Sequence, residues 1–249
     1  MFTVLSRALR FSALTKGAFD ITFASAGRLY DFRAGVAPND VALREVLPGI
    51  GWRHVVLDEL DRSVRFTHRA TRLDLGGFAK GHAVDQAAAW LKRLGIEHAY
   101  LSAGGDSRVI GDRRGRPWSL GIRDPRVENE LVAVLPLEDI SVSTSGDYER
   151  CFMRNGQRIH HLIDPRTGQP ARGAASVTVL ASDGTTAEAM SKMLFVMGAE
   201  RGFELLSRTP GVDAVVVSTD GELHATPGLN TRHADELGRP VDRAQPLAQ

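Results

Sequence analysis

The chain has 249 residues, of which 43% are hydrophobic and 24% are charged, as in an ordinary globular protein. Its 31 basic and 30 acidic side chains leave a net charge of +1, so no strong field of one sign favours nucleic acid or an anionic membrane as a partner. A single cysteine, Cys151, excludes a disulfide framework and argues against a cysteine-based zinc site. No apolar run approaches the ~18 residues that a membrane span needs.

Helices and one hairpin are expected in the first part of the chain. Apolar residues at helical spacing predict an opening helix over residues 3–15 and a short helix around 40–46. Alternating apolar and polar residues on both sides of a turn at 61–62 predict a hairpin. Residues 82–94 have strong helical periodicity, and Gly95 is a suitable C-terminal cap for that helix.

Strands dominate the rest of the chain. HAYLSAGG predicts a buried strand that runs into a glycine turn, and WSLGIRDP, LVAVLPL, SVTVLAS and DAVVVST predict further strands. Asn155-Gly156 is the strongest hairpin signal in the sequence. Helices are expected before Gly198 and over residues 199–207. This mixture predicts an α+β fold in one domain over residues 1–225, with a flexible tail over 226–249.

The stretch LDLGGFAKGHAVD, residues 73–85, combines two glycines with a lysine before a helix. Gly76 and Gly77 allow a ligand to approach the backbone, and the helix start offers free N–H groups beside the Lys80 charge. These features suit a phosphate, but the spacing is not that of a P-loop. The sequence leaves a plain strand–turn–helix connection equally open.

Two later stretches also carry polar groups. In LSAGGDSRVIG, Asp106 follows a glycine pair at a strand end, where it either faces a ligand or caps its own backbone. STSGDYER offers hydroxyl groups, and HHLIDPRTGQP contains two adjacent histidines. Because His160 and His161 would point to opposite faces of a strand, at most one of them lines a given pocket.

The helix TTAEAMSKMLFVMG places Glu188 and Lys192 four residues apart on one face. Such a pair forms an i,i+4 ion pair worth ~0.2–0.5 kcal/mol on an exposed helix. A carboxylate near the helix start also complements the helix dipole.

Together these motifs carry a resemblance that no single one provides. GAFDIT, LDLGGFAKGHAVD, SAGGD, PWSLGIRDP, TSGDYER, HHLIDPRTG and the run from SVTVLAS to LFVMG occur in the order and spacing of the ApbE family, the FAD:protein FMN transferases. The resemblance covers about residues 5–222. It implies two intimately packed lobes of mixed or antiparallel sheet with flanking helices, and a flavin nucleotide cleft between them. It further implies Mg²⁺-assisted transfer of FMN from FAD to a threonine of an acceptor flavoprotein, with release of AMP.

The resemblance also assigns roles to individual residues. His161 matches the histidine that takes the proton of the acceptor hydroxyl, a task suited to a side chain that titrates near neutral pH. The other matching residues would contact FAD. They are Gly76, Gly77, Lys80, Asp106, Thr144, Ser145 and Asp147.

This sequence departs from the family where metal ligands are expected. Glu188 stands in place of an aspartate and Lys192 in place of a threonine. Glutamate can bind Mg²⁺, but lysine only donates hydrogen bonds. Either Asp183, Thr185 or Thr186 supplies the missing oxygen, or the Lys192 ammonium replaces part of the metal's charge and takes a catalytic role.

A second departure concerns the front of the chain, where family members usually carry several dozen more residues before GAFD. As written, the chain has no signal peptide and is expected to be cytoplasmic, whereas a start further upstream would allow a periplasmic or anchored protein. Two other functions remain open. The protein could bind FAD without catalysis, or it could hydrolyse FAD to FMN and AMP.

Overall fold

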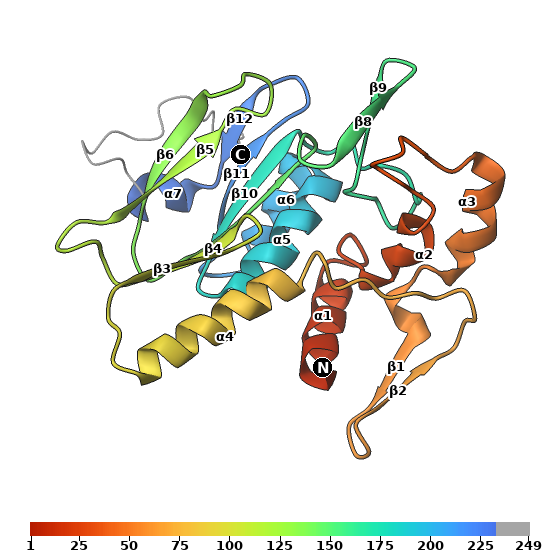
Figure 1. The fold of residues 1–249 in the computed structure, drawn as a ribbon, viewed down its shortest axis with the longest axis horizontal. Helices are drawn as coiled ribbons and strands as arrows, with labels where there is room; N and C mark the ends of the chain where they lie inside the picture. Colours follow the sequence, from red (N-terminus) through yellow and green to blue (C-terminus); the bar gives the residue numbers. More distant parts are fainter. Residues whose placement is uncertain (233–249) are drawn as a thin grey trace. The chain divides into compact units, whose positions relative to one another are not determined.

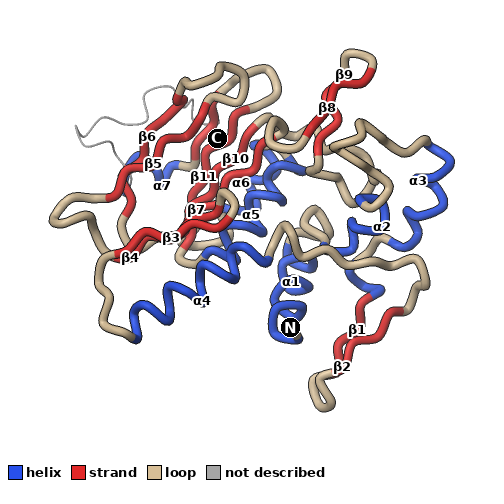
Figure 2. Tube along the Cα trace, in the orientation of Figure 1, coloured by secondary structure: helices blue, strands red, loops and turns tan. Residues whose placement is uncertain are grey.

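The computed structural model describes residues 1–232, which form two compact units (Figure 1). Unit 1 consists of residues 1–77 and 147–171, and unit 2 consists of residues 78–146 and the described residues from 172 to 232. Both units combine helices with antiparallel strands (Figure 2). The predicted α+β class is therefore confirmed.

Unit 1 holds short helices and two hairpins, close to the positions that the sequence predicted. Leu5, Ala8 and Ser12 recur at helical spacing and form the buried face of the first helix. The 61–62 turn and the Asn155-Gly156 turn each close an antiparallel pair. The elements of this unit are α1 (Phe2–Leu14), η1 (Ile21–Phe23), α2 (Ala24–Gly27), α3 (Asp40–Val46), η2 (Leu47–Gly49), η3 (Trp52–His54), β1 (Val55–Asp58), β2 (Ser63–Phe66), β8 (Cys151–Arg154) and β9 (Gln157–His160).

Unit 2 is built on a six-stranded antiparallel sheet in the order β12-β11-β10-β7-β4-β3. A separate hairpin joins β5 to β6. The elements of this unit are α4 (Ala79–Arg93), β3 (Ala99–Ala103), β4 (Asp106–Ile110), β5 (Trp118–Arg123), β6 (Leu131–Leu137), β7 (Ser141–Gly146), β10 (Ser176–Ala181), α5 (Gly184–Met197), α6 (Ala199–Leu206), β11 (Asp213–Val217), β12 (Leu223–Ala225) and α7 (Pro227–Arg232).

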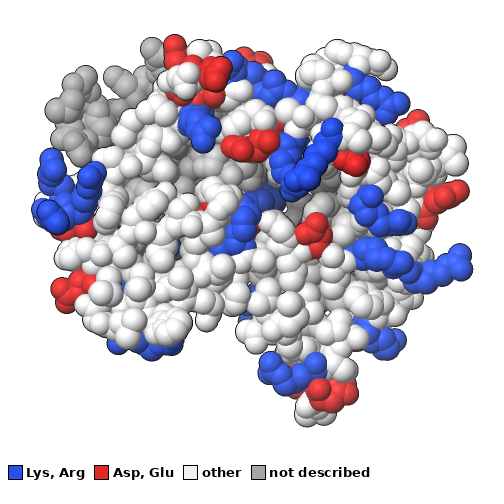
Figure 3. All heavy atoms as spheres, viewed as in Figure 1, with Lys and Arg blue, Asp and Glu red and all other residues white. Residues whose placement is uncertain are grey.

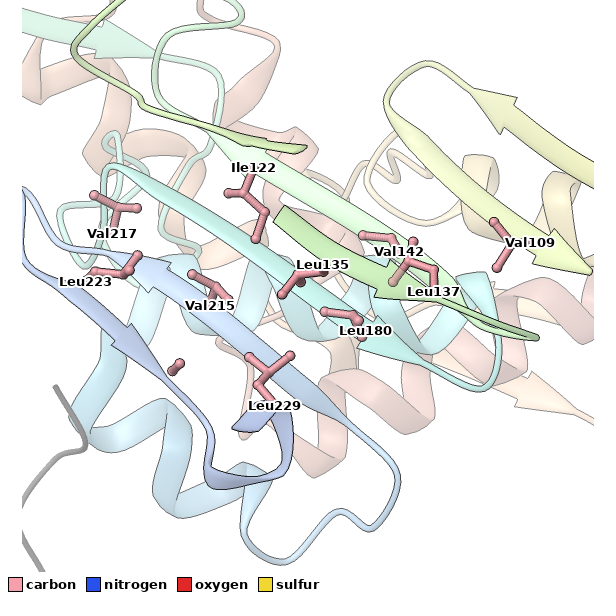
Figure 4. Packing of buried hydrophobic residues seen from close by; sticks show 11 residues of the cluster. Val109, Ile122, Leu135, Leu137, Val142, Leu180, Val215, Val217, Leu223 and Leu229 are labelled. Atoms are coloured by element: carbon pink, nitrogen blue, oxygen red, sulfur yellow. The ribbon is translucent and has the colours of Figure 1, made fainter. Parts of the chain in front are cut away.

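The two faces of this sheet differ in chemistry because side chains alternate along each strand. One face packs its aliphatic side chains against the β5–β6 hairpin and α7 (Figure 4). Val142 of β7 and Leu180 of β10 pair directly on this face, and Leu229 of α7 completes the cluster. On the opposite face, Ser143 and Ser145 of β7 meet α5. The polar face therefore lies beneath the helix that carries Glu188 and Lys192.

Two expectations need correction. The strand in HAYLSAGG exists as β3, but none of its residues is buried, because β3 is the edge strand of the sheet. The flexible tail was expected from Thr226, yet 227–232 form α7 and Leu229 is fully buried. One apolar side chain thus anchors a segment whose average composition is polar. Residues 233–249 of the expected tail lie outside the described residues.

The distribution of charged side chains and the length and polarity of the helices can be compared with the sequence over residues 1–232. Basic and acidic side chains both occur across the face drawn in Figure 3, as the near-zero net charge leads one to expect. Within residues 1–232, every helix is too short or too polar to cross a bilayer.

Candidate functional site

The turn between β3 and β4 places a buried carboxylate at a hairpin end. Gly104 and Gly105 have φ angles of +56° and +93°, which glycine adopts without strain. These two residues form the whole loop, since β3 ends at Ala103 and β4 begins at Asp106. Positive φ at both positions is typical of tight hairpin turns. Asp106 has no exposed surface, so its carboxylate needs a partner inside the protein.

Lys80 provides that partner from the first turn of α4. Its Nζ lies 2.6 Å from Asp106 Oδ2 and donates a hydrogen bond of 3.2 Å to Gly104 O. The same ammonium lies 3.5 Å from Glu188 Oε1. The lysine therefore joins the β3–β4 turn to α5, and the structure brings Lys80 and Asp106, two of the residues expected to contact FAD, into direct contact.

Glu188 and Lys192 complete the group, which we call the charge cluster (Lys80, Asp106, Glu188 and Lys192). Glu188 has no exposed surface; its Oε2 accepts a hydrogen bond of 2.8 Å from Gly81 N. Its Oε1 lies 3.6 Å from Lys192 Nζ, which confirms the i,i+4 ion pair. The Lys192 side chain is only 17% exposed, so this pair is more strongly shielded from water than a pair on a helix surface.

Burial and neighbouring charges compete in setting the pKa values of the cluster. It raises the pKa of Glu188 from 4.5 to about 7, against the opposing effect of the Lys192 charge. Burial also lowers the pKa of Lys192, although Glu188 and Asp106 favour its charged form. For Lys80, burial works to lower the pKa, but the charges of Asp106 and Glu188 outweigh it and the pKa is raised.

The raised pKa of Glu188 predicts an unusual pH dependence of stability. The folded chain binds this proton more tightly than the unfolded chain, so protonated Glu188 stabilises the fold fully below pH 4.5. This stability is lost as the pH rises through 7, by roughly 3 kcal/mol in total. We expect the free energy of unfolding of the wild type to fall over this range relative to Glu188→Gln, which cannot ionise. Parallel pH profiles from urea titrations would contradict this assignment.

The hydroxyl groups expected to contact the nucleotide make hydrogen bonds within unit 2. Thr144 Oγ1 lies 2.9 Å from Thr178 Oγ1, and Ser145 Oγ lies 3.0 Å from Ser191 Oγ. Ser191 also lies 3.2 Å from Ser143 Oγ and accepts a weak hydrogen bond of 3.4 Å from Lys192 Nζ. The sequence analysis missed Ser191, although its position three residues after Glu188 places it near the same face of α5.

The other residues expected to offer an oxygen to a metal, Asp183, Thr185 and Thr186, make hydrogen bonds at the start of α5. Asp183 is the N-cap: Oδ1 accepts a hydrogen bond of 2.8 Å from Thr186 N, and Oδ2 accepts one of 2.8 Å from Thr186 Oγ1. Asp85 of α4, another residue that the sequence analysis missed, accepts hydrogen bonds of 2.6 Å from Gly184 N and from Thr185 Oγ1. These contacts fix the start of α5 against α4.

The pattern of the whole chain decides its family. The model of the ApbE family matches residues 1–216, almost the whole described chain. The chain belongs to the ApbE family. The resemblance stated from the motifs is therefore confirmed.

Named relatives agree with this family assignment. An FAD:protein FMN transferase of Rhodobacter capsulatus is 37% identical over 91% of this chain and 44% of its own length. One of Treponema pallidum is 34% identical over 93% of this chain and 69% of its own. The chain thus spans less than half of the first relative and about two thirds of the second.

Solved ApbE structures share the fold. The ApbE protein of Thermotoga maritima superposes with a TM-score of 0.86 at 34% identity, covering 92% of this chain and 76% of that one. The flavin transferase ApbE of Vibrio cholerae gives a TM-score of 0.79 at 31% identity, covering 92% and 75%. The backbone of this chain therefore follows the ApbE fold over most of its length.

Four of the residues expected at the site belong to unit 1, where Gly76 and Gly77 precede α4. Gly76 N donates a hydrogen bond of 2.5 Å to Asp74 Oδ1, so this amide is not free for a phosphate. Asp147 Oδ1 accepts a hydrogen bond of 2.8 Å from Arg158. His161 is the residue directly after β9. Its ring lies edge-on to the ring of Phe32, with 6.5 Å between the ring centroids.

Proposed function

We propose that this ApbE-family chain transfers FMN from FAD to a threonine hydroxyl of an acceptor flavoprotein. The observation that carries the proposal is the family membership over residues 1–216, with relatives named FAD:protein FMN transferase. The charge cluster supports it, because two ammonium groups held by buried carboxylates suit the diphosphate of FAD.

The transfer is a phosphoryl-type substitution in which bonds and protons balance. The acceptor oxygen attacks the phosphorus that carries the riboflavin group, and the bond from this phosphorus to the bridging oxygen breaks. AMP leaves, and the hydroxyl proton passes to a base, for which we propose His161. Since such reactions depend on positioning and charge neutralisation, Lys80 is expected to bind diphosphate oxygens beside Asp106.

The other contacts to FAD follow from the family resemblance. We include Gly76, Gly77, Thr144, Ser145 and Asp147 in the proposed binding set. Thr144 and Ser145 would keep their hydrogen bonds to neighbouring hydroxyl groups and accept or donate one more, as a hydroxyl group allows. The assignment of residues 1–225 to one functional domain and the cytoplasmic location stay predictions.

The function is tested by incubating the purified protein with FAD and a flavoprotein subunit that carries a target threonine. We expect the acceptor to gain the mass of FMN, with one AMP released per flavin attached. AMP with free FMN would instead indicate a pyrophosphatase. Intact bound FAD would indicate a non-catalytic flavin-binding protein, a function that the Lys192 departure favours.

A matched variant tests the proposed base. His161→Ala should suppress the rate of transfer by about 10²–10⁴-fold, the usual contribution of a positioned base. Its affinity for FAD, measured from the quenching of flavin fluorescence, should stay within a few-fold of the wild type. His160→Ala is the control, because His160 is the adjacent histidine. Its side chain is buried, and its Nε2 lies 3.0 Å from Ala171 O. Full transfer activity in His161→Ala would place the base elsewhere.

A further inference from the structure

The residues around Glu188 do not suit the divalent cation that the family resemblance implies. Mg²⁺ prefers about six oxygen ligands at ~2.0–2.1 Å in octahedral geometry. Here Glu188 Oε2 is engaged by Gly81 N, and Oε1 faces two ammonium groups at 3.5 and 3.6 Å. Lysine has no lone pair for a metal when charged. Within residues 1–232, no three histidine, cysteine or acidic side chains are grouped to hold a metal.

The alternative oxygen donors do not repair this deficit. Asp183 and Thr186 bond to each other at the start of α5, and the Thr185 hydroxyl donates to Asp85. Moving any of them to a metal would break the cap of α5 or its link to α4. Such a cap is worth about 0.5–2 kcal/mol.

The buried oxygens of the cluster point to ammonium partners instead. Asp106 Oδ1 and Oδ2 and Glu188 Oε1 are buried and accept no hydrogen bond of good geometry from the described residues. Asp106 Oδ2 nevertheless lies 2.6 Å from Lys80 Nζ, and Glu188 Oε1 lies within 3.6 Å of Lys192 Nζ. Two carboxyl groups therefore face two ammonium groups. A divalent cation beside Glu188 Oε1 would lie next to both ammonium groups, which would repel it.

We propose that this chain has exchanged the metal of its family for an amino group, so that Lys80 and Lys192 donate hydrogen bonds to the diphosphate without a tightly bound divalent cation. That the bound diphosphate belongs to FAD rests on the proposed function. The weak binding of a divalent cation does not depend on that function. Lys192 suits the task because its ammonium lies 3.6 Å from Glu188 Oε1, within the same group as Lys80, and 17% of its side chain is exposed. It follows that removing Lys192 leaves two carboxylates against one ammonium, an excess of negative charge that attracts a cation.

Mn²⁺ binding followed by electron paramagnetic resonance tests the metal statement without FAD. Mn²⁺ has the oxygen preference of Mg²⁺, and its signal is lost when it binds. We expect the wild type and Lys92→Thr to leave micromolar Mn²⁺ free. Lys92 is a lysine of α4 in an exposed ion pair with Asp139, so this variant controls for the loss of one charge. Lys192→Thr should bind Mn²⁺ at least about tenfold more tightly than either. Stoichiometric binding of Mn²⁺ by the wild type would overturn the proposal, whether or not the variant folds.

FAD binding with and without EDTA provides the second arm. The affinity of the wild type for FAD should be the same with and without EDTA. Lys192→Thr should bind FAD about ten- to a hundredfold more weakly than the wild type in EDTA, and added Mg²⁺ should restore its affinity. Loss of wild-type FAD binding in EDTA would overturn the proposal. If the wild type bound no FAD under any condition, the proposed function would fail, and the Mn²⁺ titration would still decide the metal statement.

Discussion

Replacing Gly81 by alanine should strongly destabilise unit 2 and loosen the charge cluster. A Cβ at this position would lie 2.5 Å from the carbonyl carbon of Gly184 and 2.8 Å from Thr185 N. These are backbone atoms at the start of α5, so no flexible side chain can move aside. The cost of such overpacking is typically about 1–3 kcal/mol and rises when the neighbour is rigid. Alanine gains at most about 1 kcal/mol of helix propensity over glycine, so the clash should prevail.

The same substitution has a consequence for the site. Gly81 N donates the hydrogen bond to Glu188 Oε2, and Lys80 is the preceding residue. Moving α4 away from α5 therefore also separates Lys80 from Glu188. We expect guanidinium unfolding to show a loss of about 3 kcal/mol and FAD binding to weaken. Ala89→Ser adds one atom to an exposed position of α4 and should change stability by less than about 0.5 kcal/mol. Equal stability of Gly81→Ala and Ala89→Ser would show that α4 and α5 are not in close backbone contact.

Local patterns predicted most elements of this fold because the relevant forces are local. The amphipathic spacing of Leu5, Ala8 and Ser12 defines α1, and Asn155-Gly156 closes the β8–β9 hairpin through its own backbone preferences. Burial is harder to predict, since it depends on which strands become neighbours. The composition of HAYLSAGG suits a central strand, but the sheet order places β3 at an edge.

The site shows the same division between local and distant effects. The Glu188–Lys192 pair follows from helical spacing alone. In contrast, Gly81 and Glu188 are 107 positions apart, and no pattern in either segment reveals that one binds the other. At the start of α5, Asp85 of α4 accepts hydrogen bonds from Gly184 N and Thr185 N, which are 99 and 100 positions away. The sequence shows that Asp85 and Glu188 carry carboxylates. Only the packing of α4 on α5 shows which backbone N–H groups these carboxylates accept hydrogen bonds from.

Lys80→Met should lower the free energy of unfolding more than the removal of a lysine from an exposed ion pair does. The substitution preserves most of the aliphatic stem but removes the ammonium that lies 2.6 Å from Asp106 Oδ2. Asp106 is fully buried, and Lys80 Nζ is the cation that lies against its carboxylate, so the charge of Asp106 loses this partner. Breaking a fully buried pair in this way costs about 3–5 kcal/mol, and the 34% exposure of the Lys80 side chain places this pair near the lower end of that range. We expect urea titrations to show a loss of this size, together with loss of FAD binding.

A second lysine of the same helix provides the control for this prediction. Lys92 Nζ lies 3.0 Å from Asp139 Oδ1, but both side chains are about half exposed. Lys92→Met should therefore cost less than about 1 kcal/mol. The double variant Lys80→Met with Asp106→Asn removes the buried charge as well, so it should be more stable than Lys80→Met alone and bind FAD no better. Two additive single effects would mean that Lys80 and Asp106 do not interact, and the charge cluster would lose the ion pair on which the proposed diphosphate site depends.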